Sequence, residues 1–280
     1  MPTKISSIIQ KLENREKTEG KLPVLLEFYK KLLEIENGVG QQIEIPNPVF
    51  TSEAVKAHAN AGKPLLGFSE LAIDWSLLRQ TYKEIVSLFH QYREIFSELP
   101  QEITALTPGH IINKRTVRAW YRGKPIVLNT PLSDEAHKLL STIFTAAIKP
   151  FLSREAVALN SLLDMETWRR GYCPICGGNP DFSYLAKETG ARWLVCSRCD
   201  TEWLFQRLQC PYCENYDQNK LSFFTNDSGT YRLYICDQCK RYLKAVDLRQ
   251  FKDEVLLPLE RLTTLDIDQQ AQASGYSTGA

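Results

Sequence analysis

The sequence predicts an α+β protein in which an N-terminal all-helical domain is followed by two tandem metal-binding β ribbons. All eight cysteines of the 280-residue chain lie within 67 residues, and each belongs to a C-x-x-C pair. The residues before them contain no cysteine and repeat apolar side chains at helical spacing. We therefore expect a helical domain at 1–165, a first ribbon at 166–205, a second ribbon at 206–250 and a C-terminal segment at 251–280.

Helices are expected along most of the first domain. Apolar residues recur at helical spacing over 5–12 and 22–35, and Gly38 and Gly40 are expected to end the second helix. The proline-rich segment 45–48 is predicted to be a linker.

Further along this domain, segments 52–61, 69–99 and 133–150 are expected to be helices, and a further helix is expected to carry on to Trp168. Ser52 is expected to cap the first of these three helices. Ser133, followed by two acidic residues that suit the helix dipole, is expected to cap the last.

The four C-x-x-C pairs have the spacing of two tetrathiolate metal sites. Two thiolates three residues apart can hold one ion from a tight turn, and two such turns complete a tetrahedral shell. Four thiolates suit iron or zinc and are poor ligands for magnesium or calcium. We therefore expect two ions per chain, one on Cys173, Cys176, Cys196 and Cys199 and the other on Cys210, Cys213, Cys236 and Cys239.

This grouping follows from an internal repeat. Cys173-Pro-Ile-Cys176 matches Cys210-Pro-Tyr-Cys213 at an offset of 37 residues, and the second pairs match at an offset of 40. Repetition at this scale favours two copies of one unit, and an interleaved pairing would ignore it. The β-like runs 191–195 and 231–235 lead into the second pair of each copy.

Disulfides are the alternative for so many cysteines. No long apolar core is present in residues 1–10, and charged residues follow at once, so no export signal is expected. A cytoplasmic chain keeps its thiols reduced, which favours metal over disulfides. A thioredoxin-type redox motif would need only one C-x-x-C pair.

Composition argues against two classes of partner. No uninterrupted apolar run approaches the roughly 18 residues of a membrane span, so no membrane insertion is expected. The formal charge of +1 counts thiols as neutral, and two divalent ions on eight thiolates would bring it to about −3. This charge disfavours a large nucleic-acid interface.

Enzyme motifs are mostly absent from the sequence. Gly62-Lys63-Pro64 and Gly123-Lys124-Pro125 lack the rest of a phosphate-binding loop, and the sequence contains neither G-x-S-x-G nor G-x-G-x-x-G. A shell closed by four sulfurs leaves no open position for a substrate water. We therefore expect no catalytic residues and a protein that is not an enzyme.

The tetrapeptide after Cys199 is the candidate partner-binding segment. This segment either faces a partner or has a local role, in which it shapes the knuckle (the turn formed by a C-x-x-C pair) and closes the ribbon core. Its residues are Asp200, Thr201, Glu202 and Trp203. Behind the ribbons, the run 255–259 leads into an expected short helix near 262–270, and the last ten residues are expected to be mobile.

Several short motifs carry a resemblance to a known family. They are Cys173-Pro-Ile-Cys-Gly177, Cys196-Ser-Arg-Cys-Asp-Thr-Glu-Trp203, Cys210-Pro-Tyr-Cys213, Cys236-Asp-Gln-Cys239, Tyr242-Leu243-Lys244, and Leu262-Thr263-Thr264-Leu265-Asp266 before Gly275-Tyr276. Over 165–276 the chain thereby resembles the formate dehydrogenase accessory protein family, of the FdhE type. Gly177 is typical of a rubredoxin-like knuckle, whereas Glu214 stands at the equivalent place in the second copy and leaves the identity of that metal open.

The resemblance implies a cytoplasmic accessory or maturation factor that binds the catalytic subunit of formate dehydrogenase during assembly. It leaves a homodimer open. It also leaves open whether the metals are structural or redox-active. Two other functions compete with this one, a rubredoxin-type electron carrier and a zinc-ribbon nucleic-acid-binding protein.

Overall fold

The chain divides into two compact units in the computed structural model. One unit comprises the described parts of 1–46 and 68–154, and the other those of 47–67 and 155–280. Segment 47–67 therefore groups with the cysteine region, although the sequence placed it inside a helical domain at 1–165. The structure describes every residue except 1–3, 45–49, 97–99, 105, 127, 129, 130 and 280. The predicted linker at 45–48 thus lies outside the described residues.

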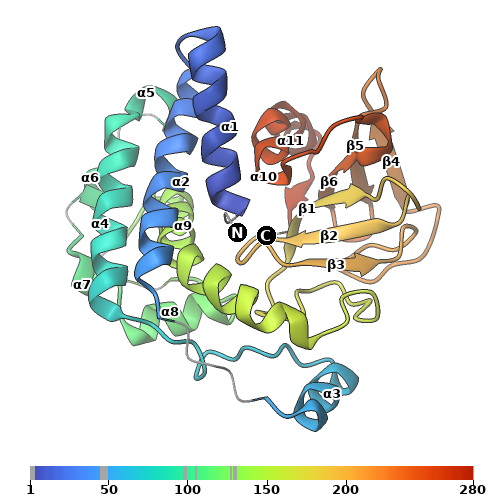
Figure 1. Cartoon of the computed structure of the whole chain (residues 1–280), viewed down its shortest axis with the longest axis horizontal. Coiled ribbons are helices and arrows are strands. Elements are labelled where there is room, and N and C mark those ends of the chain that lie inside the picture. The colour runs from blue at the N-terminus through green and yellow to red at the C-terminus, as the bar shows by residue number, and fades with distance from the viewer. Residues whose placement is uncertain are drawn as a thin grey trace. The chain divides into compact units, whose positions relative to one another are not determined.

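The first unit is helical (Figure 1). Its core includes an aromatic cluster in which Phe28 meets Phe89, Tyr92 and Phe96 edge-on. None of the described helices is long and apolar enough to cross a membrane. The helices are α1 (Lys4–Glu19), α2 (Val24–Gln42), α4 (Trp75–Gln91), α5 (Arg93–Phe96), α6 (Gln101–Thr104), α7 (Pro108–Ile111), α8 (Lys114–Tyr121) and α9 (Asp134–Leu159), the last of which runs on into the second unit.

Two predicted helix ends are wrong. Helix α2 continues through Gly38 and Gly40, because its packing against α4 offsets the roughly 1 kcal/mol that an interior glycine costs. Helix α4 begins after Asp74 rather than at Ser69. The Asp74 carboxylate accepts hydrogen bonds from the backbone N–H groups of the first turn, at 2.8 and 3.0 Å.

Helix α9 starts as predicted and ends elsewhere. The Ser133 hydroxyl accepts a hydrogen bond from the backbone of Ala136 at 3.3 Å, as expected of a cap. The helix then passes through Pro150 without stopping, and Phe151 and Leu152 are completely buried directly after it. A short 3₁₀ turn, η1 (Asn160–Leu162), follows, so the helix does not reach Trp168.

The second unit contains one mixed sheet. Within each cysteine repeat the strands are antiparallel, whereas β1 pairs with β6 in parallel. The order is β3-β2-β1-β6-β5-β4, and β7 pairs with β6. The strands are β1 (Pro180–Leu185), β2 (Arg192–Cys196), β3 (Glu202–Phe205), β4 (Leu221–Thr225), β5 (Tyr231–Cys236), β6 (Arg241–Asp247) and β7 (Ser277–Thr278).

The two predicted ribbons are thus halves of a single sheet. The parallel pair β1–β6 joins them, and Phe182 of β1, Val195 of β2 and Val246 of β6 form one buried cluster across the join. The predicted runs 191–195 and 231–235 correspond to β2 and β5.

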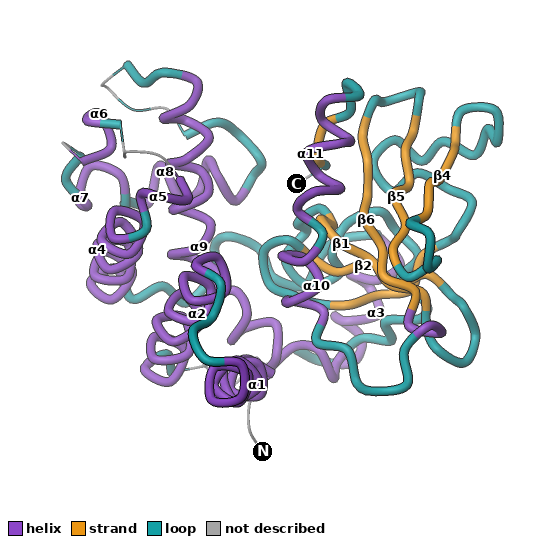
Figure 2. Tube along the Cα trace, turned by 90° about the horizontal axis from the view of Figure 1, so that it is seen from above, coloured by secondary structure: helices purple, strands orange, loops and turns teal. Residues whose placement is uncertain are grey.

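The C-terminal segment packs on the second half of the sheet. Helix α10 (Leu257–Thr263) and helix α11 (Leu265–Ala273) replace the single predicted helix near 262–270, and η2 (Leu248–Gln250) precedes them. Helix α11 lies alongside β6 (Figure 2), where Ala271 is buried against Ile235 and Tyr242. The expected mobile tail instead pairs through β7 with β6.

Candidate metal centres

Each of the four C-x-x-C pairs forms the same turn. The residue after the second cysteine has a positive φ in every case, and its N–H donates to the carbonyl of the first cysteine, at 3.0, 3.3, 3.0 and 2.8 Å in chain order. The turn folds the two sulfurs back to one side. The four residues are Gly177 (φ 71°), Asp200 (58°), Glu214 (58°) and Lys240 (54°).

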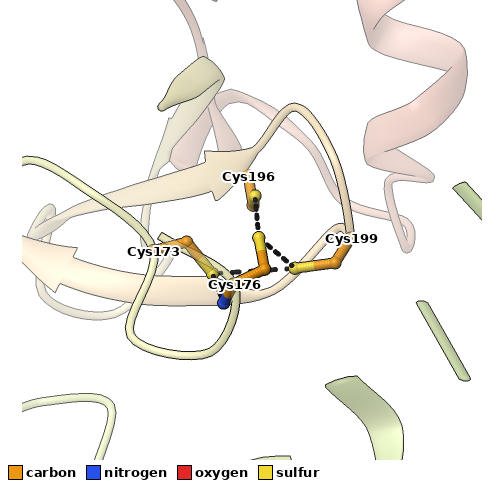
Figure 3. A group of neighbouring side chains, drawn as sticks. All are labelled: Cys173, Cys176, Cys196 and Cys199. Carbon is orange, nitrogen blue, oxygen red and sulfur yellow. Dashed lines mark hydrogen bonds between the residues drawn. The ribbon is translucent and has the colours of Figure 1, made fainter. Parts of the chain in front are cut away.

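The first quartet lies where the first two knuckles face each other (Figure 3). The Sγ atom of Cys176 is 3.5 Å from that of Cys196 and 3.4 Å from that of Cys199. The Cys173 and Cys199 sulfurs are 3.6 Å apart. A tetrahedron with metal–sulfur distances of about 2.3 Å has edges of about 3.8 Å, so the quartet has close to the size of a tetrathiolate shell.

The second quartet has the same size but a thinner cover. Its sulfurs are 3.7 Å apart between Cys210 and Cys239 and 3.6 Å apart between Cys213 and Cys236. In each quartet all ligand atoms lie within 4.8 Å of one another. The first quartet is wholly buried, whereas Cys213 is exposed and Cys239 is half-buried.

The electrostatics of both clusters favour a bound cation. Hydrogen bonds with the neighbouring thiols, reinforced by burial, raise the pKa of Cys176 well above its ordinary value. Burial also raises the pKa of Cys210, and that of Cys239 to about 11. Burial opposes ionisation of Cys236 too, but backbone hydrogen bonds from Cys239 and Gln238 and the Cys213 thiol lower its pKa. Four thiolates this close need a metal ion to hold their charge.

The grouping of the cysteines is the one that the repeat predicted. All eight are free cysteines, and the sulfur separations are far from the roughly 2.0 Å of a disulfide, so the disulfide alternative is wrong for this structure. Each quartet can hold one metal ion. Iron and zinc both fit four sulfurs.

An arginine that sequence reasoning missed secures the first centre. Arg261 of α10 donates to Asp200 at 2.6 Å, to Asp181 at 2.8 Å and to the carbonyl of Cys196 at 3.1 Å. It thereby connects the second knuckle to the start of β1. Its position beside the motif 262–266 was the one signal in the sequence.

A segment that lies between α2 and α4 in the sequence also contacts the first knuckle. After α3 (Ser52–Ala61), which Thr51 rather than Ser52 caps, the backbone N–H groups of Leu65 and Leu66 donate to the carbonyls of Pro174 and Ile175 at 3.0 and 2.8 Å. This contact, within the second unit, buries the first quartet further.

The predicted partner-binding tetrapeptide is engaged inside the protein. Asp200 pairs with Arg261, and the Thr201 hydroxyl lies 3.1 Å from the sulfur of Cys199. Glu202 accepts a hydrogen bond from Tyr184 at 2.9 Å. Trp203 is 0% exposed and donates to the Arg170 carbonyl at 2.7 Å. This geometry supports the local interpretation of these residues, in which they shape and close the ribbon, over a partner-facing one.

The motif Tyr242-Leu243-Lys244 likewise has an internal role. The Lys244 ammonium is buried and donates to Asp268 at 2.5 Å and to the carbonyls of Arg261 and Thr264 at 3.1 Å. The Tyr242 hydroxyl donates to Asp268 at 2.9 Å. These contacts hold α10 and α11 on β6.

Comparison with known proteins places this architecture. The family model described as "FdhE, central domain" matches residues 172–207, which contain the first quartet and β1 to β3. The "Protein FdhE homolog" of Aquifex aeolicus is 26% identical over 283 residues, which cover 96% of this chain and 94% of that relative. The chain is thus similar to an FdhE homolog over nearly its full length.

Two further similarities agree with this one. FdhE of Escherichia coli K12 is 34% identical over 114 residues, which cover 39% of this chain and 36% of that protein. The crystal structure of the FdhE protein from Pseudomonas aeruginosa matches this chain with a TM-score of 0.62 at 20% identity, covering 99% of this chain and 94% of that one. The structural match supports the fold of helices followed by a mixed sheet with two cysteine quartets.

Proposed function

We propose that this FdhE-type chain is a formate dehydrogenase accessory protein that binds the immature catalytic subunit in the cytoplasm and is not itself an enzyme. The family supports the accessory role, as the sequence resemblance implied. The finer step, direct binding of the catalytic subunit during assembly, is our proposal.

One observation carries the non-catalytic part of this proposal. Both quartets have the size of closed four-sulfur shells, and such a shell offers no open coordination position to substrate or water. The metals then act on the fold. They fix the knuckles, and through them the strand ends of the sheet that a partner would meet.

A rubredoxin-type electron carrier is the second candidate. Iron fits the four-sulfur quartets as zinc does, and the exposure of Cys213 brings the second quartet to the surface, where electron transfer would occur. Protein purified without added metal separates the two, because ferric sulfur sites are red and zinc sites are colourless.

The proposed function is tested with cells that lack this protein. We expect them to synthesise the formate dehydrogenase catalytic polypeptide and to accumulate it in an inactive form. The purified metal-loaded protein should bind that polypeptide in a pull-down and should oxidise no formate. Failure to bind the subunit, together with tight salt-sensitive binding to DNA, would move the function to the nucleic-acid-binding class.

A further inference from the structure

The outer strand of the second cysteine repeat is exposed in a way that its counterpart is not. Strands β1 and β4 occupy equivalent positions, since Phe182 pairs with Val195 as Ser222 pairs with Ile235, 40 residues later in both strands. In β1, Phe182, Ser183 and Leu185 are 0% exposed. In β4, Phe223 is 52% and Phe224 is 60% exposed.

The backbone of β4 is also open on one side. Within the described residues, β4 ends the strand order and pairs with β5 alone. The N–H of Asn226 donates to Tyr231 and that of Asp237 donates to Lys220. Because bonded pairs alternate in an antiparallel ladder, the backbone groups of Leu221, Phe223 and Thr225 point away from β5. Exposed edges of this kind, with apolar side chains and no charged or proline residue, are templates for another strand.

The first repeat shows what covers such an edge. There β6 lies along β1 in parallel and pairs Phe182–Leu185 with Lys244–Asp247. Beside β6, the side chains of β1 are buried, and Leu248, Phe251 and Leu257 pack against the cluster that contains Phe182. The same addition at β4 would place a parallel strand opposite residues 222–225, with side chains beside Phe223 on one face and beside Phe224 on the other.

A cavity that contains three arginines, together with Cys210 and Cys236 of the second quartet, adjoins this edge. It measures about 140 Å³, and its lining includes Phe223 and Tyr234 together with Arg192, Arg207 and Arg241. No carboxylate is among the described residues that line it. The Nε atom of Arg192 and the hydroxyl of Tyr234 are buried there without a hydrogen-bond partner in the described structure.

Arg192 itself is 2% exposed, and burial lowers its pKa to about 10. Its guanidinium donates hydrogen bonds to the backbone carbonyls of Gln206 and Gln209, which carry no charge. A carboxylate brought into the cavity would therefore meet an incompletely paired cation.

We propose that the exposed edge of β4 binds an extended, acidic segment of the immature formate dehydrogenase catalytic subunit as an added parallel strand. We call this edge the docking edge. This inference rests on the proposed function and assigns the surface through which the catalytic subunit is bound. A second copy of this chain is a poorer occupant, because β4 has the sequence Leu-Ser-Phe-Phe-Thr and brings no carboxylate to the arginines. Strand addition of this kind gives affinity through the backbone and specificity through alternate side chains.

The test uses full-length, metal-loaded protein and the catalytic subunit isolated from cells that lack this chain. Thr225→Pro removes an outward N–H that the β4–β5 ladder does not use, and Thr225→Ala is its matched control. Arg207→Glu reverses an exposed charge of the cavity, and Lys252→Glu, outside the lining, is the control for charge.

We expect Thr225→Pro and Arg207→Glu each to raise the Kd for the subunit about tenfold or more, with both controls near wild type. Metal content and β5 amide exchange should stay unchanged, and the amides of 221–225 should gain protection in the wild-type complex.

If the wild type binds and Thr225→Pro binds equally well, the docking edge is overturned while the proposed function stands. If the wild type does not bind, both are overturned. If the wild-type protein forms a dimer and Thr225→Pro dissociates it, the catalytic subunit is not the occupant of this edge. The edge is then a self-association surface.

Discussion

At the residue scale, the metal ligands could be predicted from the sequence, whereas the residues that hold them in place could not. The C-x-x-C spacing and the repeat suffice to group the eight cysteines, because both are local patterns. Arg261 and Lys244 act through contacts 61 and 24 residues away, on Asp200 and Asp268. Such contacts arise from the sheet order, which leaves no periodic signal in the sequence.

Glu214 illustrates a local departure that the structure explains. It stands where the first knuckle has Gly177, yet it has the same positive φ and the same hydrogen bond to the first cysteine. Glutamate in place of glycine therefore raises the conformational energy of the backbone at this position but leaves the turn intact. A non-glycine residue in this region costs roughly 1–2 kcal/mol.

Glu214→Gly should consequently stabilise the protein by about 1 kcal/mol and leave metal binding unchanged. Gly177→Ala should do the opposite, because φ is 71° there and a Cβ would lie 3.1 Å from Pro64. Denaturant unfolding of the metal-loaded proteins measures both changes. Equal stability of Glu214→Gly and wild type would show that the second turn is not strained by its side chain.

At the scale of single elements, the two cysteine quartets differ in their cover. The segment at Leu65 and Leu66 and the Arg261 side chain lie against the first, while Cys213 of the second is exposed. The repeat predicted the two sites but could not show this difference, because the covering residues come from outside the repeat.

A chelator should therefore remove the metal of the second quartet before that of the first. Native mass spectrometry during chelation should pass through a species with one ion per chain, and Cys213 should be alkylated before Cys176. In the Cys236→Ser protein, the ion that remains is that of the first quartet, and it should leave as slowly as it does from the wild-type protein. If both ions leave at the same rate, the burial of each quartet does not control the loss of its metal ion to the chelator.

Helices α10 and α11 depend on the buried pair of Lys244 and Asp268. Their side chains are 6% and 21% exposed, so removing one partner leaves the other charge largely buried. Lys244→Met should destabilise the protein by about 3 kcal/mol. The double variant with Asp268→Leu should recover part of that loss, which a double-mutant cycle of unfolding free energies measures. Additive losses would refute a direct coupling.

At the scale of the whole molecule, the α+β class could be predicted, but the joining of the two ribbons into one sheet could not. Helical periodicity and cysteine spacing each report on short stretches, and they identified the helical part and both repeats. The parallel pair β1–β6 joins residues about 60 positions apart. No short-range pattern specifies such a pair.

Because the sheet is continuous, damage to one repeat should reach the other. Cys236→Ser should abolish one site and also increase amide exchange in β1, across the join to β6, while α2 and α4 keep their protection. Cys196→Ser should likewise increase exchange in β6. Changes confined to the substituted repeat would instead indicate ribbons that fold independently.

The central claim is that two cysteine quartets organise this unit around two metal ions. Elemental analysis combined with native mass spectrometry of anaerobically purified protein tests it most directly. We expect two iron or zinc ions per chain, falling to one in either Cys196→Ser or Cys236→Ser. One ion or none in the wild-type protein would contradict the account.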